Sequence, residues 1–241
     1  PLRDLFKDEV RKAGLELGIK ESIVVNDRME TSVPDIYAAG DAVQVKHYVT
    51  GNDALISLAG PANKQGRIIA DNICGGDSRY LGSQGSSVIK VFDMTAATTG
   101  INETNAKKSG LEVDTVILSP MSHAGYYPGG KVMTMKVVFE KESYRLLGAQ
   151  IIGYEGVDKR IDVLATAIHA GLNATQLKDL DLAYAPPYSS AKDPVNMAGF
   201  MIDNIAKGTL KQWHLEDMDK ISKDKDVVLL DVRTVGEFSR G

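Results

Sequence analysis

The spacing of hydrophobic and polar residues changes twice along the chain and predicts three regions. In the first, apolar residues at helical spacing predict a short amphipathic helix over residues 5–13 and a long helix within residues 53–73. The long helix is expected to end at Gly75-Gly76, and Pro61 is expected to bend this helix or to begin its main part. Short apolar runs predict strands at 23–25 and 36–38. We expect this opening to be the end of a larger structure.

After Gly85 the pattern predicts a sheet with accompanying helices. Helix stops are expected at Gly110, Gly171 and Gly208. The expected strands are 87–92, 95–99, 113–118, 132–139 and 146–152, and the expected helices are 102–109, 161–170 and 195–206. Strands and helices do not alternate strictly, so this region is predicted to be an α+β domain. Without a pocket of its own, the outer face of the sheet spanning Val88 to Ile152 is expected to pair two subunits.

A third region begins beyond Lys207. A short helix is predicted around residues 215–221, followed by a buried strand over 227–232 that ends in Asp231-Val232-Arg233. A single strand cannot bury both of its faces. We therefore expect this strand to be poorly ordered, truncated or docked on the preceding domain.

Composition restricts the class of protein. The 241 residues are 43% hydrophobic, enough for one large domain or two smaller ones, and the net charge of −4 argues against nonspecific binding of nucleic acid. No apolar run approaches the length of a membrane span, and Pro1-Leu2-Arg3-Asp4 does not resemble a signal peptide, so a cytoplasmic location is expected.

Few residues suit metal or redox chemistry. The single cysteine, Cys74, excludes an intrachain disulfide and a Cys-x-x-Cys pair, and we interpret it as a structural thiol. His123 and His169 have no Cys, His or Asp partner at ligand spacing, so both are expected to be satisfied or exposed histidines, and no metal site is predicted.

The segment Thr31–Asp41 brings small residues and one carboxylate together. A carboxylate accepts hydrogen bonds from a polyol, and glycine lets the backbone approach a ligand closely. A strand-to-helix turn capped by the Asp is the alternative. The run Tyr37-Ala38-Ala39-Gly40-Asp41 resembles the second flavin-contacting motif of the pyridine nucleotide-disulfide oxidoreductases. The resemblance implies that Ala39, Gly40, Asp41 and Ala42 bind FAD, with Asp41 on the ribityl chain.

A second candidate for flavin binding is the helix start at residues 58–67. Amides at a helix start are unpaired donors with partial positive charge, which suits an electron-rich flavin edge. The same family places this turn beside the flavin pyrimidine, which would give that role to Leu58 and Ala59. An ordinary helix entry is the alternative.

Two further segments are rich in aromatic residues, proline and glycine: 122–131, with Tyr126-Tyr127-Pro128, and 184–194, with Tyr184-Ala185-Pro186-Pro187-Tyr188. Taken singly, each would be read as a surface turn with a packed tyrosine. A tyrosine hydroxyl can, however, stabilise or protonate a thiolate leaving a disulfide. Lysines supply compact charge for phosphates.

Together these segments resemble the coenzyme A-disulfide reductases. The resemblance implies that Tyr126 and Tyr184 face the substrate sulfur and the flavin of the other subunit. It also implies that Lys64 and Lys192 lie near the coenzyme A phosphates and that Ser122 contributes to substrate binding. Tyr127 and Tyr188 are interpreted as packing residues.

The resemblance covers nearly the whole chain and implies a mixed α/β and α+β fold class. Residues 1–84 would be the end of an NAD(P)H-binding domain and the C-terminal part of an FAD-binding domain. Residues 85–208 would be a dimerisation domain, and 209–241 a linker and the truncated start of a rhodanese domain.

The implied enzyme is a homodimer with an active site shared between subunits, and it uses FAD and NAD(P)H to reduce coenzyme A disulfide, or coenzyme A persulfide or polysulfide, to thiols. The chain has neither Gly-x-Gly-x-x-Gly loop nor the family's N-terminal redox cysteine, so it is not expected to turn over alone. The alternatives are an NADH oxidase that reduces oxygen and a non-catalytic dimerisation fragment. The choice between NADH and NADPH stays open.

Overall fold

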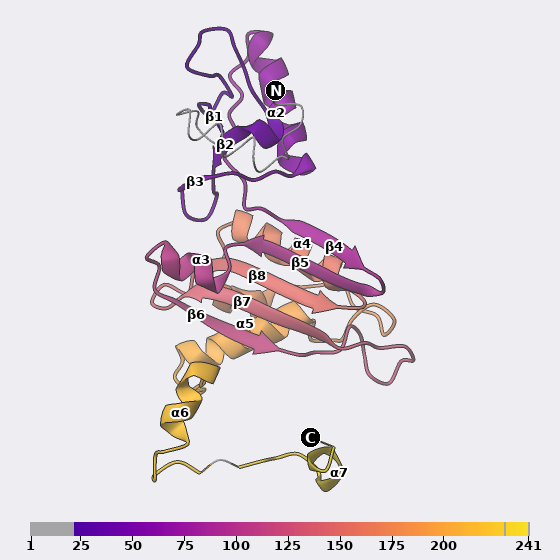
Figure 1. The fold of residues 1–241 in the computed structure, drawn as a ribbon. Coiled ribbons are helices and arrows are strands. Elements are labelled where there is room, and N and C mark those ends of the chain that lie inside the picture. The colour runs from indigo at the N-terminus through magenta and orange to yellow at the C-terminus, as the bar shows by residue number, and fades with distance from the viewer. Residues whose placement is uncertain (1–21, 229, 241) are drawn as a thin grey trace, which may run out of the picture. The chain divides into compact units, whose positions relative to one another are not determined.

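The computed structural model describes residues 22–228 and 230–240 (Figure 1). The chain divides into two compact units, one reaching to Asp203 and the other starting at Asn204. The helix predicted over residues 5–13 lies outside the described residues.

The first part of the larger unit contains a small sheet and one long helix. The strands are β1 (Ile23–Val24), β2 (Val43–Lys46) and β3 (Asp53–Ala54), in the order β1-β2-β3, with β1 parallel and β3 antiparallel to β2. The helix is α2 (Ala59–Ile73), and Pro61 lies in its first turn, where a missing N–H costs nothing. The prediction that Pro61 begins the main helix is confirmed, but residues 53–54, predicted within the helix, form β3.

The prediction of a buried strand at residues 36–38 is wrong. Tyr37 forms a single bridge to Glu30, and the side chain of Ile36 is 52% exposed. A turn closed by Ile36 N and Val33 O at 3.2 Å, with Asp35 at φ 62°, folds this stretch back as a loop. The buried strand of this region is β2, which begins directly after the short 3-10 helix η2 (Gly40–Ala42).

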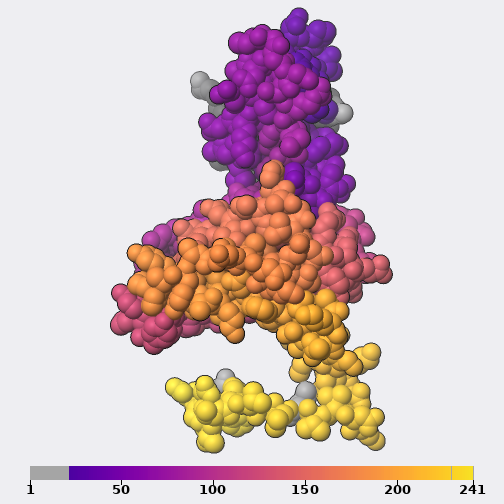
Figure 2. All heavy atoms as spheres, turned by 180° about the vertical axis from the view of Figure 1, so that it is seen from behind, coloured from indigo at the N-terminus to yellow at the C-terminus, as the bar shows by residue number. Residues whose placement is uncertain are grey.

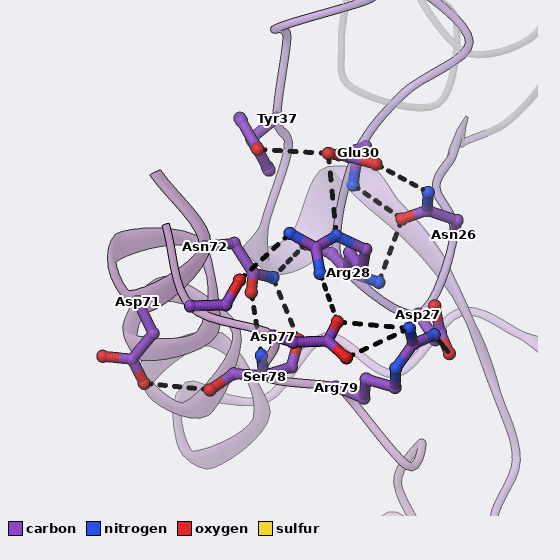
Figure 3. Close-up of polar contacts among 11 residues, drawn as sticks. Asn26, Asp27, Arg28, Glu30, Tyr37, Asp71, Asn72, Asp77, Ser78 and Arg79 are labelled. Carbon is purple, nitrogen blue, oxygen red and sulfur yellow. Dashed lines mark hydrogen bonds and ion pairs between the residues drawn. The ribbon is translucent and has the colours of Figure 1, made fainter. Parts of the chain in front are cut away.

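A polar network fastens this loop to the end of α2 (Figure 3). The buried amide of Asn72 donates to the carbonyls of Arg28 and Ser78 at 3.2 and 2.9 Å, and it accepts from Ser78 N at 2.8 Å. The hydroxyl of Tyr37 donates to Glu30 Oε1 at 3.1 Å. Segments before and after the Thr31–Asp41 stretch are therefore held against one helix end.

The second part of this unit is a five-stranded antiparallel sheet with the strand order β4-β5-β8-β7-β6. Its strands are β4 (Ser87–Val91), β5 (Met94–Gly100), β6 (Val113–Leu118), β7 (Met133–Glu140) and β8 (Leu146–Gly153). The helix α3 (Glu103–Lys108) precedes β6, and the side chain of Asn102 caps it by accepting from Asn105 N at 2.8 Å. All five predicted strands and this helix are confirmed to within two residues at each end.

Helices cover one face of the sheet, as the view from behind shows (Figures 1 and 2). The helix α4 (Val157–His169) packs against β5 and β8, and α5 (Pro194–Ala206) lies on the same side, with the 3-10 helix η3 (Ala174–Asp179) between them in the sequence. On the opposite face, neighbouring strands contribute side chains to a shallow hollow of about 410 Å³, among them Ile89, Thr98, Thr134, Gln150 and Ile152. Of the helices described in this unit, α4 and α5 do not cover that face, and α3 lies at one end of it, where Glu103 pairs with Lys136 of β7.

The smaller unit contains η4 (Leu215–Asp217), α6 (Met218–Ile221) and α7 (Val235–Phe238). The short helix predicted around residues 215–221 is confirmed. The prediction of a buried strand at residues 227–232 is wrong, because the described residues of this run form no strand and the side chains of Val228 and Val232 are exposed. No neighbouring strand pairs with the described part of this run, and an extended segment is stable only in a sheet.

Candidate functional site

The predicted flavin motif packs on the first half of α2. Gly40 adopts φ 79°, a left-handed conformation that favours glycine, and its amide donates to Gln65 Oε1 at 2.7 Å. A Cβ built at Gly40 would lie 3.9 Å from the Cβ of Ala62. Gln65 is almost fully buried. Sequence reasoning placed it inside a motif but gave it no role, whereas the structure makes it the link between motif and helix.

The other predicted flavin residues lie at this same corner. Leu58 is the N-cap of α2 and has no side-chain oxygen to cap it, and Ala59 and Gly60 are exposed. The first amides of the helix are therefore accessible donors with partial positive charge. Asp41 is also exposed. The structure thus brings together an exposed carboxylate, a left-handed glycine and a helix start.

The second candidate site is a pair of tyrosines. Tyr126 and Tyr184 lie on different loops, 58 positions apart in the sequence, and their hydroxyl oxygens are 2.7 Å apart. Both side chains are exposed. The hydrogen bond from Tyr126, followed by partial burial, raises the pKa of Tyr184 above its usual value. The Tyr184 hydroxyl, like an ordinary tyrosine, is protonated at neutral pH and can donate a hydrogen bond.

A buried ion pair lies beneath the two tyrosine loops. Arg160 of α4 and Asp193, which directly precedes α5, are 1% and 2% exposed, and Arg160 Nη2 lies 2.9 Å from Asp193 Oδ2. The guanidinium also donates to Ser122 O at 2.9 Å and to Ser189 Oγ at 3.1 Å.

Sequence reasoning missed this pair, although a signal was present. Arg160 occupies a position on the apolar face of its helix, with Val157, Ile161 and Leu164. A charged residue there must be paired or hydrogen-bonded. Asp193-Pro194 is a typical helix entry, and the Asp193 carboxylate accepts from Val195 N at 3.0 Å.

The remaining predicted substrate residues are separated. A cavity of about 540 Å³ beside Tyr184 is lined by Ser122, His123, Lys159, Arg160 and Tyr188, among others. Ser122 is buried, and its hydroxyl accepts from Lys131 N at 3.1 Å. Lys192 is exposed and does not line this cavity, and neither does Lys64, which is exposed on α2.

Other side chains with reactive groups are accounted for locally. The prediction that both histidines are satisfied or exposed is confirmed: His123 Nδ1 lies 3.1 Å from Ala124 O, and exposed His169 stacks on Tyr48. Tyr127 packs edge-on against His123, but Tyr188 is 72% exposed, so its interpretation as a packing residue is wrong.

Cys74 is exposed at the end of α2, so its thiol adds nothing to the core. Among the described residues no cluster of three or more His, Cys, Asp or Glu could hold a metal ion. None of the described helices is long and apolar enough to cross a membrane.

The chain resembles known proteins over most of its length. Residues 86–194 match the dimerisation domain of the pyridine nucleotide-disulphide oxidoreductases, and residues 3–66 match the pyridine nucleotide-disulphide oxidoreductase domain. A CoA-dependent NAD(P)H sulfur oxidoreductase of Pyrococcus abyssi is 38% identical over 77% of this chain and 41% of its own length. A coenzyme A disulfide reductase of Staphylococcus aureus is 36% identical over 79% of this chain and 43% of its own.

A crystal structure of reduced Bacillus anthracis CoADR-RHD superposes with a TM-score of 0.87 and 48% identity. The superposition covers 91% of the present chain and 40% of the Bacillus anthracis chain. The present chain therefore spans about two fifths of the length of each of these proteins.

Proposed function

The chain belongs to the pyridine nucleotide-disulphide oxidoreductase family, and from this premise we propose that it is part of an enzyme that reduces coenzyme A disulfide, or coenzyme A persulfide or polysulfide, to thiols. FAD and NAD(P)H are the cofactors of this class. When bound, FAD supplies the two-electron carrier between the nicotinamide and the sulfur substrate.

One observation carries the choice of a sulfur substrate. The hydroxyls of Tyr126 and Tyr184 meet at 2.7 Å on an exposed surface. Reduction of a disulfide by two electrons and two protons gives two thiols, and each departing thiolate needs a proton or a hydrogen-bond donor. A paired, protonated tyrosine supplies that donor. Water formation from oxygen has no sulfur leaving group for this pair to serve, so the NADH oxidase is the less favoured alternative.

The experiment compares electron acceptors in the full-length enzyme. We expect anaerobic oxidation of NADH or NADPH to be fast with coenzyme A disulfide, or with polysulfide plus coenzyme A. Air alone should support slow oxidation. The absorbance of NAD(P)H at 340 nm measures all three reactions. Equal or faster oxidation in air without a sulfur acceptor would establish the oxidase alternative instead.

We assign FAD contacts to Ala39, Gly40, Asp41, Ala42, Leu58 and Ala59. Asp41→Ala in the full-length enzyme is expected to weaken FAD retention, because a charge-assisted hydrogen bond to the ribityl chain contributes roughly 1.5–3 kcal/mol, or about 10- to 100-fold in affinity. The flavin content after dialysis measures the effect. Asp93→Ala, which removes an exposed carboxylate from the turn between β4 and β5, is the matched control. Retention equal to that of the control would refute the assignment.

The separation of Lys64 from the tyrosine cavity supports a site shared between subunits. We propose that the enzyme is a homodimer, that residues 85–208 form its dimerisation domain, and that the face of the sheet opposite α4 and α5 is the contact surface. In this arrangement Lys64 of one subunit and Lys192 with the tyrosines of the other would face the same coenzyme A. A strict monomer by light scattering at micromolar concentration would contradict it.

We propose further that residues 209–241 are a linker and the start of a rhodanese domain. The support is the apolar run ending in Asp231-Val232-Arg233, followed by Glu237-Phe238. The exposed Val228 and Val232 would find partner strands in the remainder of such a domain.

A further inference from the structure

The two loops that carry the tyrosine pair are joined to each other below the surface. Ala124, two residues before Tyr126, donates its amide to the carbonyl of Ser189 at 3.0 Å. Ser122 closes the base of its own loop, because its amide donates to Lys131 O at 2.7 Å. The position of Tyr126 therefore depends on where Ser189 is held.

Ser189 is in turn held by the buried ion pair. Its hydroxyl is fully buried, donates to Asp193 Oδ2 at 2.6 Å and accepts from Arg160 Nη2 at 3.1 Å. The same Nη2 donates to Ser122 O at 2.9 Å, so one nitrogen contacts both loops. A guanidinium suits this role because its donors are fixed in one plane and stay charged.

A further bond fixes the guanidinium from its own helix end. Arg160 Nη1 donates to Gly156 O at 3.2 Å, and Nε donates to Asp193 Oδ2 at 3.2 Å. The Arg160 side chain is 1% exposed, and it forms part of the wall of the cavity beside Tyr184. Charge-assisted hydrogen bonds between buried groups are stronger than neutral ones, so the loops have one favoured separation.

We infer that Arg160, Asp193 and Ser189 are positioning residues, which set the separation of the Tyr126 and Tyr184 hydroxyls and thereby the rate at which the pair serves the leaving sulfur. This inference rests on the function proposed above. None of the three contacts the substrate in this scheme. Their effect on the reaction passes through the tyrosines.

The test uses Ser189→Ala in the full-length enzyme, because it removes one hydroxyl and leaves the ion pair in place. We expect kcat for disulfide reduction to fall by about 10-fold or more with KM little changed, since displacement of a catalytic group by about 1 Å can cost about 100-fold. A crystal structure of the variant should place the two tyrosine hydroxyls beyond 3.5 Å. Thr99→Val is the matched control, because Thr99 is an equally buried hydroxyl on β5 and bonds to Ser86 instead.

A structural role alone would give a different result. In a Tyr184→Phe background, Ser189→Ala should cause no further loss of kcat, because its effect passes through that tyrosine. An equal loss in both backgrounds, or an unchanged hydroxyl separation, would overturn the inference. If Tyr184→Phe alone reduces the disulfide at the normal rate, the catalytic role of the tyrosine pair is refuted, while the hydroxyl separation still decides whether the buried residues position the pair. Failure of the full-length enzyme to reduce any sulfur acceptor would refute the proposed function instead. Arg160→Lys, which keeps the charge but not the planar fork, should reproduce the lengthened separation.

Discussion

Tyr184→Phe in the full-length enzyme is expected to slow the reduction of coenzyme A disulfide on the order of 10- to 1,000-fold while leaving the fold and the bound flavin unchanged. The substitution removes one oxygen from an exposed side chain. It also removes the hydroxyl that is proposed to serve the leaving sulfur as a hydrogen-bond donor. A leaving thiolate would then depart without a proton or a hydrogen bond.

The two half-reactions separate this effect from a general loss of activity. Reduction of the flavin by NAD(P)H, followed by stopped-flow absorbance, should keep the normal rate, because Tyr184 is proposed to act only on the sulfur substrate. The rate at which the disulfide reoxidises the flavin should show the whole decrease. Tyr188→Phe is the matched control: Tyr188 is on the same loop, and it is more exposed than Tyr184. If both variants reduce the disulfide at the normal rate, Tyr184 has no catalytic role.

The second hydroxyl of the pair should behave as part of the same unit. Because Tyr126 and Tyr184 share one hydrogen bond of 2.7 Å, removing both is expected to cost less than the product of the two single losses. Independent losses that multiply would mean that each tyrosine serves a different step.

Local patterns were sufficient to predict the sheet domain. Strands such as β6 (Val113–Leu118) are apolar runs bounded by turn residues, and the helix stops at Gly110, Gly171 and Gly208 adopt the left-handed conformation that glycine favours. These signals lie within a few residues of one another. Propensity and tertiary packing agree here, so the predicted boundaries are nearly those observed, except that α4 begins at Val157, four residues before its predicted start.

The errors fall where an element depends on distant partners. The run 36–38 has strand composition, but the turn at Asp35 returns it toward Glu30 as a loop. The run 227–232 is equally apolar, yet its described residues find no partner strand. Periodicity reports a preference for burial and does not report whether a partner exists.

The exposed residues of the candidate site could be predicted from the sequence, but the buried residues beneath them could not. Tyr126 and Tyr184 could be chosen because their loops resemble a known family, but their hydroxyl contact joins positions that no local pattern relates. Arg160 and Asp193 are 33 positions apart, and a charge run is usually exposed, so a sequence gives little reason to bury either. The folded chain pairs them because both helices, α4 and α5, pack on the same face of the sheet.

That buried pair also predicts the largest effect on stability. Asp193→Asn is expected to lower the free energy of unfolding by about 3–5 kcal/mol, because Arg160 would keep its charge in a buried layer without a counter-charge. Asparagine can still cap α5 by accepting from Val195 N, so Asp193→Ala should cost about 1 kcal/mol more. The double variant Arg160→Met with Asp193→Asn should recover much of the lost stability, since no unpaired charge remains.

Urea unfolding measures the free energy of unfolding of all three variants. The control is Asp181→Ala, which removes an exposed carboxylate from the segment before Tyr184 and should stay within about 0.5 kcal/mol of the unaltered protein. A loss for Asp193→Asn no larger than that of Asp181→Ala would mean that water reaches Arg160 and that the charge there needs no partner.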